Sequence, residues 1–267
     1  DSGFISSGAL IFPLSPLSHT MQSRSTPYGT VRIGPVEALY DWLARHMSQH
    51  VSNRICPPSV ALTGGSTPMG FYRWMATRMM SFAPVAKQII WTVSDERLVP
   101  LDSPDSNFGN ARRSLLDPMG VPDDSMLAWD TERSPDDAAE WYSHLWAYSF
   151  GERKSYDLCL LGMGPDCHVA SLFPGSPLLE DLQDPSRGFS AVEVPDKGWR
   201  LTITPEGLRR SESIVIMVTG ASKAEALGRV FGGGDESVVN CPARLMGLFP
   251  EKVTWLVDHD AGAGIPA

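Results

Sequence analysis

The chain has 267 residues, of which 42% are hydrophobic and 20% charged, and its formal net charge is −9. This length and composition are typical of a globular protein with a full hydrophobic core, in one large α/β domain or two smaller ones. The acidic balance, without any run of Lys or Arg, argues against binding to nucleic acid or to an anionic membrane surface. No apolar run approaches the roughly 20 residues that a membrane helix needs.

The first residues are rich in Ser, Pro and Gly. We expect residues 1–27 to be a flexible leader or a cloning remnant, and residues 28–267 to form a single folded domain. The chain has four cysteines: Cys56, Cys159, Cys167 and Cys241. Their spacing is neither that of a Cys-x-x-Cys pair nor that of a zinc site. Cys159 lies in an apolar, strand-like run, where a buried reduced thiol is the ordinary interpretation, so we expect a reducing compartment, the cytoplasm.

Short apolar runs, Gly-containing or polar turns and helical stretches alternate along the chain. The predicted strands are Val60–Thr63, Ile89–Val93, Asp157–Leu161, Trp199–Thr204, Ile214–Val218 and Val253–Val257. The predicted helices are Pro35–Val51, a stretch from Pro68 to about Met80, Pro135–Phe150, and a stretch from Ser222 to about Val230. Near-continuous apolar runs suit strands that are buried on both faces of a parallel sheet. We therefore predict one doubly wound α/β domain, with a mainly parallel sheet flanked by helices and a ligand beyond the carboxyl ends of the strands.

The segment Gly64–Pro68, Gly-Gly-Ser-Thr-Pro, follows a predicted strand and opens a predicted helix. Gly64 and Gly65 would let the backbone approach an anion, while N–H groups at a helix start point towards it. Ser66 and Thr67 add hydroxyl groups. A capped helix with a tight turn explains the same residues equally well. The segment has neither the Walker pattern nor Gly-x-Gly-x-x-Gly, which disfavours ATP and NAD.

Three basic residues lie close to predicted strand ends. Arg97 follows Ile89–Val93, Arg200 lies near the start of another strand, and Lys223 lies in the first turn of a helix. A guanidinium fork suits a phosphate or a carboxylate. The helix dipole disfavours a lysine at the helix start, which suggests an anion beside it. Each residue alone is as well explained by a solvated charge or a surface salt bridge, but together they favour a phosphate site.

The segment from Gly162 to His168, Gly-Met-Gly-Pro-Asp-Cys-His, follows the strand Asp157–Leu161. A neutral imidazole at the carboxyl edge of the sheet can take a proton from water and return it to a leaving group. Asp166 precedes His168 by two residues and could fix its tautomer. The alternative is a histidine that only caps the turn.

In their order along the chain, these segments resemble the 6-phosphogluconolactonases, within the glucosamine-6-phosphate isomerase/6-phosphogluconolactonase family. The resemblance spans about residues 36 to 257. The matching segments are Leu62–Pro68, Ser94–Pro100, Asp105–Phe108, Gly162–Gly175, Arg200–Thr202 and Thr219–Lys223. Each segment is short, and it is their common order that makes the resemblance specific. It implies a Rossmann-like fold of the NagB/RpiA type.

The resemblance implies that the chain hydrolyses 6-phospho-D-glucono-1,5-lactone to 6-phosphogluconate, in the oxidative branch of the pentose phosphate pathway. It implies a small phosphosugar lactone as the ligand, a monomer or small homo-oligomer, and no metal or organic cofactor. Carried over residue by residue, His168 is the expected general base on water, with Asp166 beside it. The expected substrate or phosphate contacts are Gly64, Gly65, Ser66, Thr67, Arg97, Arg200 and Lys223.

One position departs from the family pattern. Where the family has glycine, this chain has Cys167, between the aspartate and the histidine of the turn. If that glycine has a positive φ, a side chain there costs on the order of 1 kcal/mol and shifts the neighbouring histidine. We give little weight to a thiol nucleophile here, because adjacent residues rarely point into the same space.

Two other functions stay open at this stage. A glucosamine-6-phosphate deaminase/isomerase has the same fold, but the continuation Ser171–Gly175 is of the lactonase type. A non-catalytic sugar-phosphate sensor is favoured only by Cys167, and no DNA-binding segment accompanies the domain. Ammonia release would identify the deaminase, and phosphate-dependent stabilisation without turnover would identify the sensor.

Overall fold

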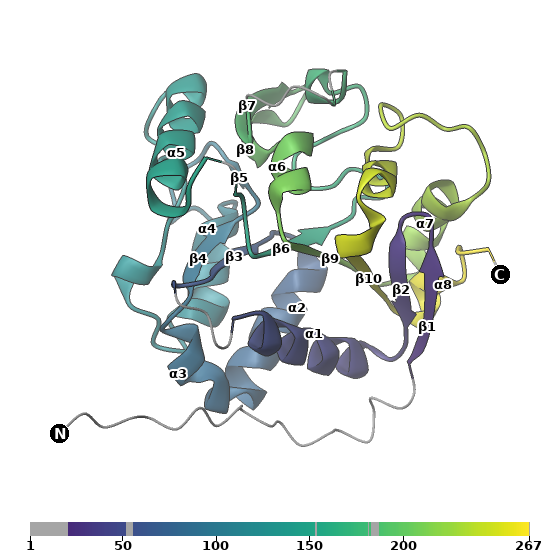
Figure 1. Cartoon of the computed structure of the whole chain (residues 1–267), viewed down its shortest axis with the longest axis horizontal. Helices are drawn as coiled ribbons and strands as arrows, with labels where there is room; N and C mark the ends of the chain where they lie inside the picture. The colour runs from purple at the N-terminus through teal and green to yellow at the C-terminus, as the bar shows by residue number, and fades with distance from the viewer. Residues whose placement is uncertain (1–20, 52–55, 153, 181, 183–186, 267) are drawn as a thin grey trace.

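Seven strands form the large sheet of the protein, in the order β1-β2-β10-β9-β6-β3-β4 (Figure 1). Their bounds are β1 Gln22–Thr26, β2 Gly29–Ile33, β3 Ser59–Leu62, β4 Ile90–Val93, β6 Leu158–Gly162, β9 Ser213–Val218 and β10 Val253–Val257. Neighbouring strands are parallel, except for the antiparallel hairpin of β1 and β2. The structure, a computed structural model, describes residues 21–51, 56–152, 154–180, 182 and 187–266.

A separate antiparallel sheet holds β5 (Asp95–Arg97), β8 (Gly198–Ile203) and β7 (Phe189–Val194), in the order β5-β8-β7. Its strand β8 was predicted, whereas β5 was interpreted as a turn because three residues are too few to show an alternating pattern. Ser94 alone separates β4 from β5, so the chain crosses directly from the large sheet to the small one at this point.

The helices cover the large sheet and one side of the small one. Their bounds are α1 Val36–Val51, α2 Ser66–Arg78, α3 Ala83–Ala86, α4 Asn107–Ala111, α5 Pro135–Phe150, α6 Pro205–Arg210, α7 Ala224–Phe231 and α8 His259–Gly262. Figure 1 shows α1 below the large sheet, and α5 above it beside the small sheet. Helix α1 buries Leu39, Leu43 and Met47, whose spacing places them on one face, towards β10.

The predicted mainly parallel α/β fold is confirmed, and the predicted strands and helices lie within one to three residues of the observed ones. The strands β3 and β9 are buried at every position, which is why their sequences are continuous apolar runs. Within the described ranges, no helix is long and apolar enough to cross a membrane.

The predicted domain boundary at residue 28 is wrong for residues 22–26, which form β1. This strand pairs along its whole length with β2, from Gln22 opposite Ile33 to Thr26 opposite Gly29. The Thr26 hydroxyl donates to the Gly29 carbonyl oxygen at 2.7 Å and closes the turn. The strand could not be recognised from the sequence, Gln-Ser-Arg-Ser-Thr, because an exposed edge strand needs no alternating apolar residues. The remainder of the predicted leader, residues 1–20, lies outside the described residues.

Strand β1 should contribute measurably to stability. We expect a chain that begins at Tyr28 to have a free energy of unfolding about 2 kcal/mol or more below that of a chain beginning at Met21, because it loses several ladder hydrogen bonds worth roughly 1 kcal/mol each. Urea unfolding of the two truncated chains would measure the difference. Equal unfolding midpoints would show that residues 21–27 belong to the leader after all.

Candidate active site

A cavity of about 250 Å³ lies at the carboxyl edge of the large sheet. The segments that follow β3, β4, β6 and β9 line it, because the carboxyl ends of parallel strands meet at one edge. Of the predicted site residues, those lining the cavity are Gly64, Gly65, Ser66, Thr67, Arg97, His168 and Lys223. The structure therefore brings together residues that are up to 159 positions apart in the sequence, Gly64 and Lys223.

His168 is held by a carboxylate and by an aromatic ring. Its Nδ1 lies 2.6 Å from Asp166 Oδ1, and its ring stacks on that of Phe173 with the ring centroids 4.1 Å apart. Burial alone would raise the pKa of Asp166, but the hydrogen bond and the positive charge of His168 outweigh burial and lower that pKa to about 2. An ionised Asp166 accepts from Nδ1–H, which leaves Nε2 as the atom that can take up a proton.

Two glycines make room for this arrangement. A Cβ atom on Gly164 would lie 2.1 Å from His168 Nδ1 and 2.4 Å from Asp166 Oδ1. A Cβ atom on Gly64 would lie 2.0 Å from Asn107 Oδ1. No side chain fits at such distances, so both positions require glycine for the close approach of a polar neighbour.

Cys167 adopts the left-handed conformation that its position predicted, with φ at 69°. Its side chain is fully buried, and its Sγ donates a weak hydrogen bond to the Ala226 carbonyl oxygen at 3.6 Å. Cys167 does not line the cavity, whereas His168 does. The cysteine therefore keeps the glycine-like backbone of the turn, at a cost of about 1 kcal/mol, and directs its side chain into the core.

The basic residues differ in their position. Arg97 lines the cavity, and its Nη1 donates to the Asp105 carbonyl oxygen at 2.6 Å and to Asn107 Oδ1 at 3.2 Å. Lys223 also lines the cavity, and burial lowers its pKa against the opposing charge of Asp166. Arg200 lies opposite Arg97 in the β5–β8 ladder but does not line the cavity. Burial, and secondly the charge of Arg97, lower the pKa of Arg200.

The start of α2 faces the same cavity. Its N-cap is Gly65, and among the described residues no side chain caps the helix there. The first N–H groups of a helix have no acceptor within the helix, so this end can bind an anion. The Thr67 hydroxyl lies 2.8 Å from the Thr219 hydroxyl, which links the turns after β3 and β9. Because Gly65 is the N-cap and no described side chain accepts a hydrogen bond from the start of α2, the alternative of a helix capped by Ser or Thr is wrong.

Asp95 and Asn107 are among the lining residues that were not predicted as site residues. Asp95 is buried, and its Oδ2 accepts from the Ser171 hydroxyl at 2.7 Å. Burial raises the pKa of Asp95, while the Ser171 hydrogen bond and the charges of His168 and Arg97 oppose that rise. Both residues belong to the segments that carry the family resemblance, but only the tertiary structure shows that they line the cavity.

A fully buried carboxylate holds these residues in place. Glu96 accepts hydrogen bonds from four donors, which are the N–H groups of Arg97, Asn107 and Phe108 and the Ser106 hydroxyl. These bonds tie β5 to the start of α4, so they fix Arg97 and Asn107 relative to each other. The alternative of a solvated charged turn at this segment is wrong, because Glu96 is 0% exposed.

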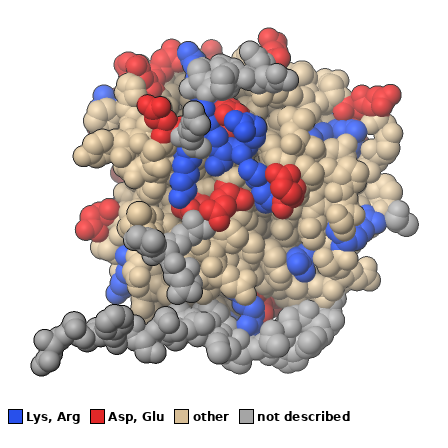
Figure 2. Space-filling view, in the orientation of Figure 1, with Lys and Arg blue, Asp and Glu red and all other residues tan. Residues whose placement is uncertain are grey.

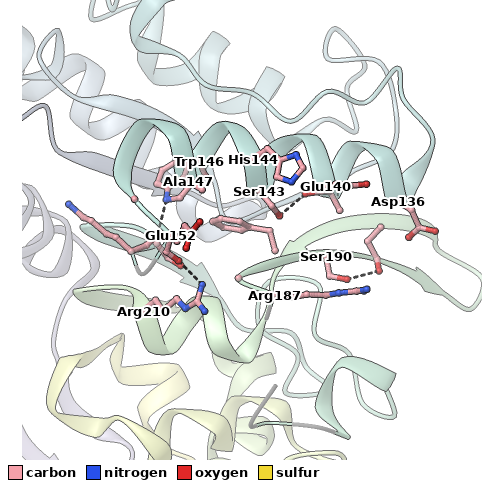
Figure 3. A pocket seen from close by; sticks show the side chains of 17 residues that line it. Asp136, Glu140, Ser143, His144, Trp146, Ala147, Glu152, Arg187, Ser190 and Arg210 are labelled. Atoms are coloured by element: carbon pink, nitrogen blue, oxygen red, sulfur yellow. Dashed lines mark hydrogen bonds between the residues drawn. The ribbon is translucent and has the colours of Figure 1, made fainter. Parts of the chain in front are cut away.

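A larger cavity, of about 780 Å³, lies between α5 and β7 (Figure 3). It is lined by exposed positions such as His144, and its Arg210 donates to the Glu152 carbonyl oxygen at 2.9 Å. The strand ends of the large sheet do not border it. In the part of the chain that the structure describes, no group of three or more His, Cys, Asp or Glu side chains could hold a metal ion.

Comparison with known proteins relates most of the chain to one family. The family model described as glucosamine-6-phosphate isomerases/6-phosphogluconolactonase matches residues 35–255. A 6-phosphogluconolactonase from Synechocystis is 34% identical over 214 residues, 78% of this chain and 84% of that protein. The human 6-phosphogluconolactonase is 31% identical over 207 residues, 76% of this chain and 79% of that protein. The solved structure of a Trypanosoma cruzi 6-phosphogluconolactonase has a TM-score of 0.76 at 24% identity and covers 93% of this chain and 100% of that one, which is a likeness of fold.

The role of Glu96 can be tested by unfolding. We expect Glu96→Gln to lower the free energy of unfolding by about 2–3 kcal/mol, because an amide cannot accept from four donors and leaves buried N–H groups unpaired. The exposed Glu132 provides the matched control, since Glu132→Gln should change the free energy of unfolding by less than about 0.5 kcal/mol. Urea unfolding would measure both, and equal stabilities of the two variants would disprove this role.

Proposed function

This chain belongs to the glucosamine-6-phosphate isomerase/6-phosphogluconolactonase family, and we propose that it hydrolyses 6-phospho-D-glucono-1,5-lactone to 6-phosphogluconate. It is a lactone-hydrolysing enzyme, as its curated relatives from cyanobacteria to human are 6-phosphogluconolactonases. The observation that carries the proposal is the pairing of His168 with an ionised Asp166 in one cavity with the cations of Arg97 and Lys223.

The 6-phosphate is the part of the substrate that positions the rest. The Lys223 ammonium, the Arg97 guanidinium and the N–H groups at the start of α2 bind it through charge-assisted hydrogen bonds. These donors surround the cavity that His168 also lines, so a phosphate bound by them places the lactone carbonyl, C1, beside the imidazole. Asp95 and Asn107 are then available to bind hydroxyl groups of the sugar.

His168 performs the proton transfers. Its Nε2 takes a proton from water while the water oxygen attacks C1, and backbone N–H groups stabilise the oxyanion that forms. The ionised Asp166 stabilises the imidazolium. The bond between C1 and the ring oxygen then breaks, and the imidazolium protonates that oxygen. The product is an open-chain hydroxy acid, which loses its carboxyl proton to solvent.

The cellular context belongs to the same proposal. We place the enzyme in the cytoplasm, as a monomer or small homo-oligomer, with a small phosphosugar as its only required ligand. Figure 2 shows Lys and Arg side chains bordered by Asp and Glu side chains on the face drawn, which supports recognition of a small anion rather than of nucleic acid. The fully buried thiol of Cys159 suits a reducing compartment.

A pH-stat assay on freshly prepared 6-phospho-D-glucono-1,5-lactone tests the activity. We expect acid release above the spontaneous rate, in proportion to enzyme concentration. The matched substrate is glucosamine 6-phosphate, from which we expect no ammonia. Ammonia release without lactone hydrolysis would replace the lactonase by the deaminase/isomerase.

The proposed base can be removed without touching the phosphate contacts. We expect His168→Ala to lower kcat/KM by about 10²–10⁴-fold, which is the usual contribution of general acid–base catalysis. The control is His144→Ala, since His144 is an exposed residue of the larger cavity (Figure 3), and it should retain full activity. Full lactonase activity in His168→Ala would remove His168 from the mechanism.

The lowered pKa of Lys223 predicts a pH-dependent affinity. The ammonium is present below this pKa and is lost as the pH rises through it, so binding of 6-phosphogluconate should weaken by about tenfold or more between about pH 7 and 10. Lys223→Arg should keep its affinity over this range, because guanidinium stays charged. Calorimetric titration of both proteins would measure this, and identical pH profiles would show that Lys223 does not bind the phosphate.

A further inference from the structure

The residue that follows the last strand, Asp258, binds a turn at the edge of the cavity. Its N–H donates to the Val218 carbonyl oxygen at 3.3 Å, which continues the parallel pairing of β10 with β9. Its carboxylate oxygens Oδ1 and Oδ2 both accept from the Gly220 N–H, at 3.0 and 2.9 Å. Gly220 is the N-cap of the single helical turn that ends at Lys223. The Asp258 side chain is therefore bound to the segment that carries a proposed phosphate contact.

The backbone of this turn depends on Gly220. Its φ is 93°, a conformation that favours glycine, and a Cβ atom there would meet nothing within 4 Å. Backbone conformation, and not space, therefore requires glycine at this position. The Lys223 N–H donates to the Gly220 carbonyl oxygen at 3.0 Å. Because Asp258 holds the N–H of the residue on which the turn closes, it fixes the backbone from which the Lys223 side chain extends.

Helix α8 follows Asp258 and packs beside α7 and the turn before it (Figure 1). Asp258 is the N-cap of α8, because its Oδ1 also accepts from the Ala261 N–H at 2.9 Å. Just after α8, a Cβ atom on Gly264 would overlap the Ala224 carbonyl oxygen, so the two backbones touch there. Ala224 directly follows Lys223. The C-terminal segment thus contacts the chain on both sides of the lysine.

The Lys223 ammonium itself is not held by a partner. Within the described part of the chain, no group forms a hydrogen bond or salt bridge with it. The turn is joined to the other wall of the cavity by the Thr219 hydroxyl, which lies 2.8 Å from the Thr67 hydroxyl at the start of α2. The position of the ammonium therefore depends on the backbone of the turn, which is attached to α2 on one side and to Asp258 on the other.

We propose that Asp258 is a positioning residue for phosphate binding, which keeps the Lys223 ammonium at the cavity by holding Gly220. The inference rests on the proposed function, in which Lys223 binds the 6-phosphate. Asp258 does not line the cavity, so it touches no substrate and acts through the turn. A role only as the N-cap of α8 predicts a loss of stability without a loss of affinity. The positioning role predicts a loss of affinity that requires Lys223.

Binding of 6-phosphogluconate to the full chain, measured by calorimetric titration, tests this role. We expect Asp258→Ala to raise Kd by about tenfold, because the ammonium loses its place in a charge-assisted contact. The KM for the lactone should rise with it while kcat changes by less than about threefold, since the lost contact binds substrate and transition state alike. Asp258→Asn should restore most of the affinity, because an amide oxygen still accepts from the Gly220 N–H.

A double-mutant cycle shows whether Asp258 acts through Lys223. In a Lys223→Met background, Asp258→Ala should change Kd by less than about twofold, because the group that it positions is already missing. A further loss of about tenfold in the double variant would make the two effects additive. Additive effects would overturn the proposal, since they would show that Asp258 acts on some other part of the site.

The matched control is the loss of another helix cap. Thr204 is the N-cap of α6, accepts from the Gly207 N–H at 3.1 Å and does not line the cavity. Thr204→Ala should lower the urea midpoint, as Asp258→Ala should, but change Kd by less than about twofold. Equal weakening of 6-phosphogluconate binding in the two variants would overturn the proposal, because loss of stability alone would then explain it.

Amide hydrogen exchange separates this proposal from the proposed function. In NMR spectra of isotope-labelled protein, the Gly220 amide should exchange at least about tenfold faster in Asp258→Ala than in the unmodified chain or in Thr204→Ala, because its acceptor is gone. Unchanged protection of Gly220 would overturn the positioning role. An unmodified chain that neither hydrolyses the lactone nor binds 6-phosphogluconate would instead overturn the proposed function, while the exchange rates would still show whether Asp258 holds the turn.

Discussion

Parallel pairing of β3, β6 and β9 is the constraint on which the site depends. β6 lies between the other two strands, with Leu158 in register with Val60 on one side and with Ser213 on the other. Since all three run in the same direction, their carboxyl ends and the turns that follow share one edge of the sheet (Figure 1). The helix start at Gly65, the histidine turn and Lys223 each follow one of these strands. Their meeting in one cavity therefore depends on the three strands being neighbours in the sheet.

Three carboxylates near the cavity show how environment assigns different roles to the same chemical group. Glu96 and Asp95 are buried, which raises the pKa of each, and hydrogen-bond donors compensate for the burial. Asp166 is partly exposed and close to an imidazole, so its pKa is lowered. Glu96 therefore joins the small sheet to α4, whereas Asp166 orients His168. A change of residue at either position would leave the other largely unaffected, because they act through different partners.

Cys167, in the turn before His168, combines a left-handed backbone with a buried side chain. The close approach of His168 to Gly164 requires a tight turn, and this turn places Cys167 in the left-handed region. The side chain is buried in the core, where its Sγ contacts the Ala226 carbonyl oxygen of α7. Position 167 thus has the backbone conformation of a glycine but carries a thiol, and it lies next to the proposed base, His168.

The sequence alone determined the mainly parallel α/β class, six of the ten described strands, four of the eight described α-helices and seven of the residues that line the cavity. Buried parallel strands leave continuous apolar runs, and the turns that follow them carry the Gly, His and Lys residues of the site. It did not reveal β1, whose exposed edge needs no apolar pattern, β5, which is three residues long, or the strands β2 and β7. Only the tertiary structure decided three features: Asp95 and Asn107 line the cavity, Arg200 lies outside it, and Cys167 contacts α7. Each depends on the pairing of segments far apart in the chain, and local patterning carries no information about such register.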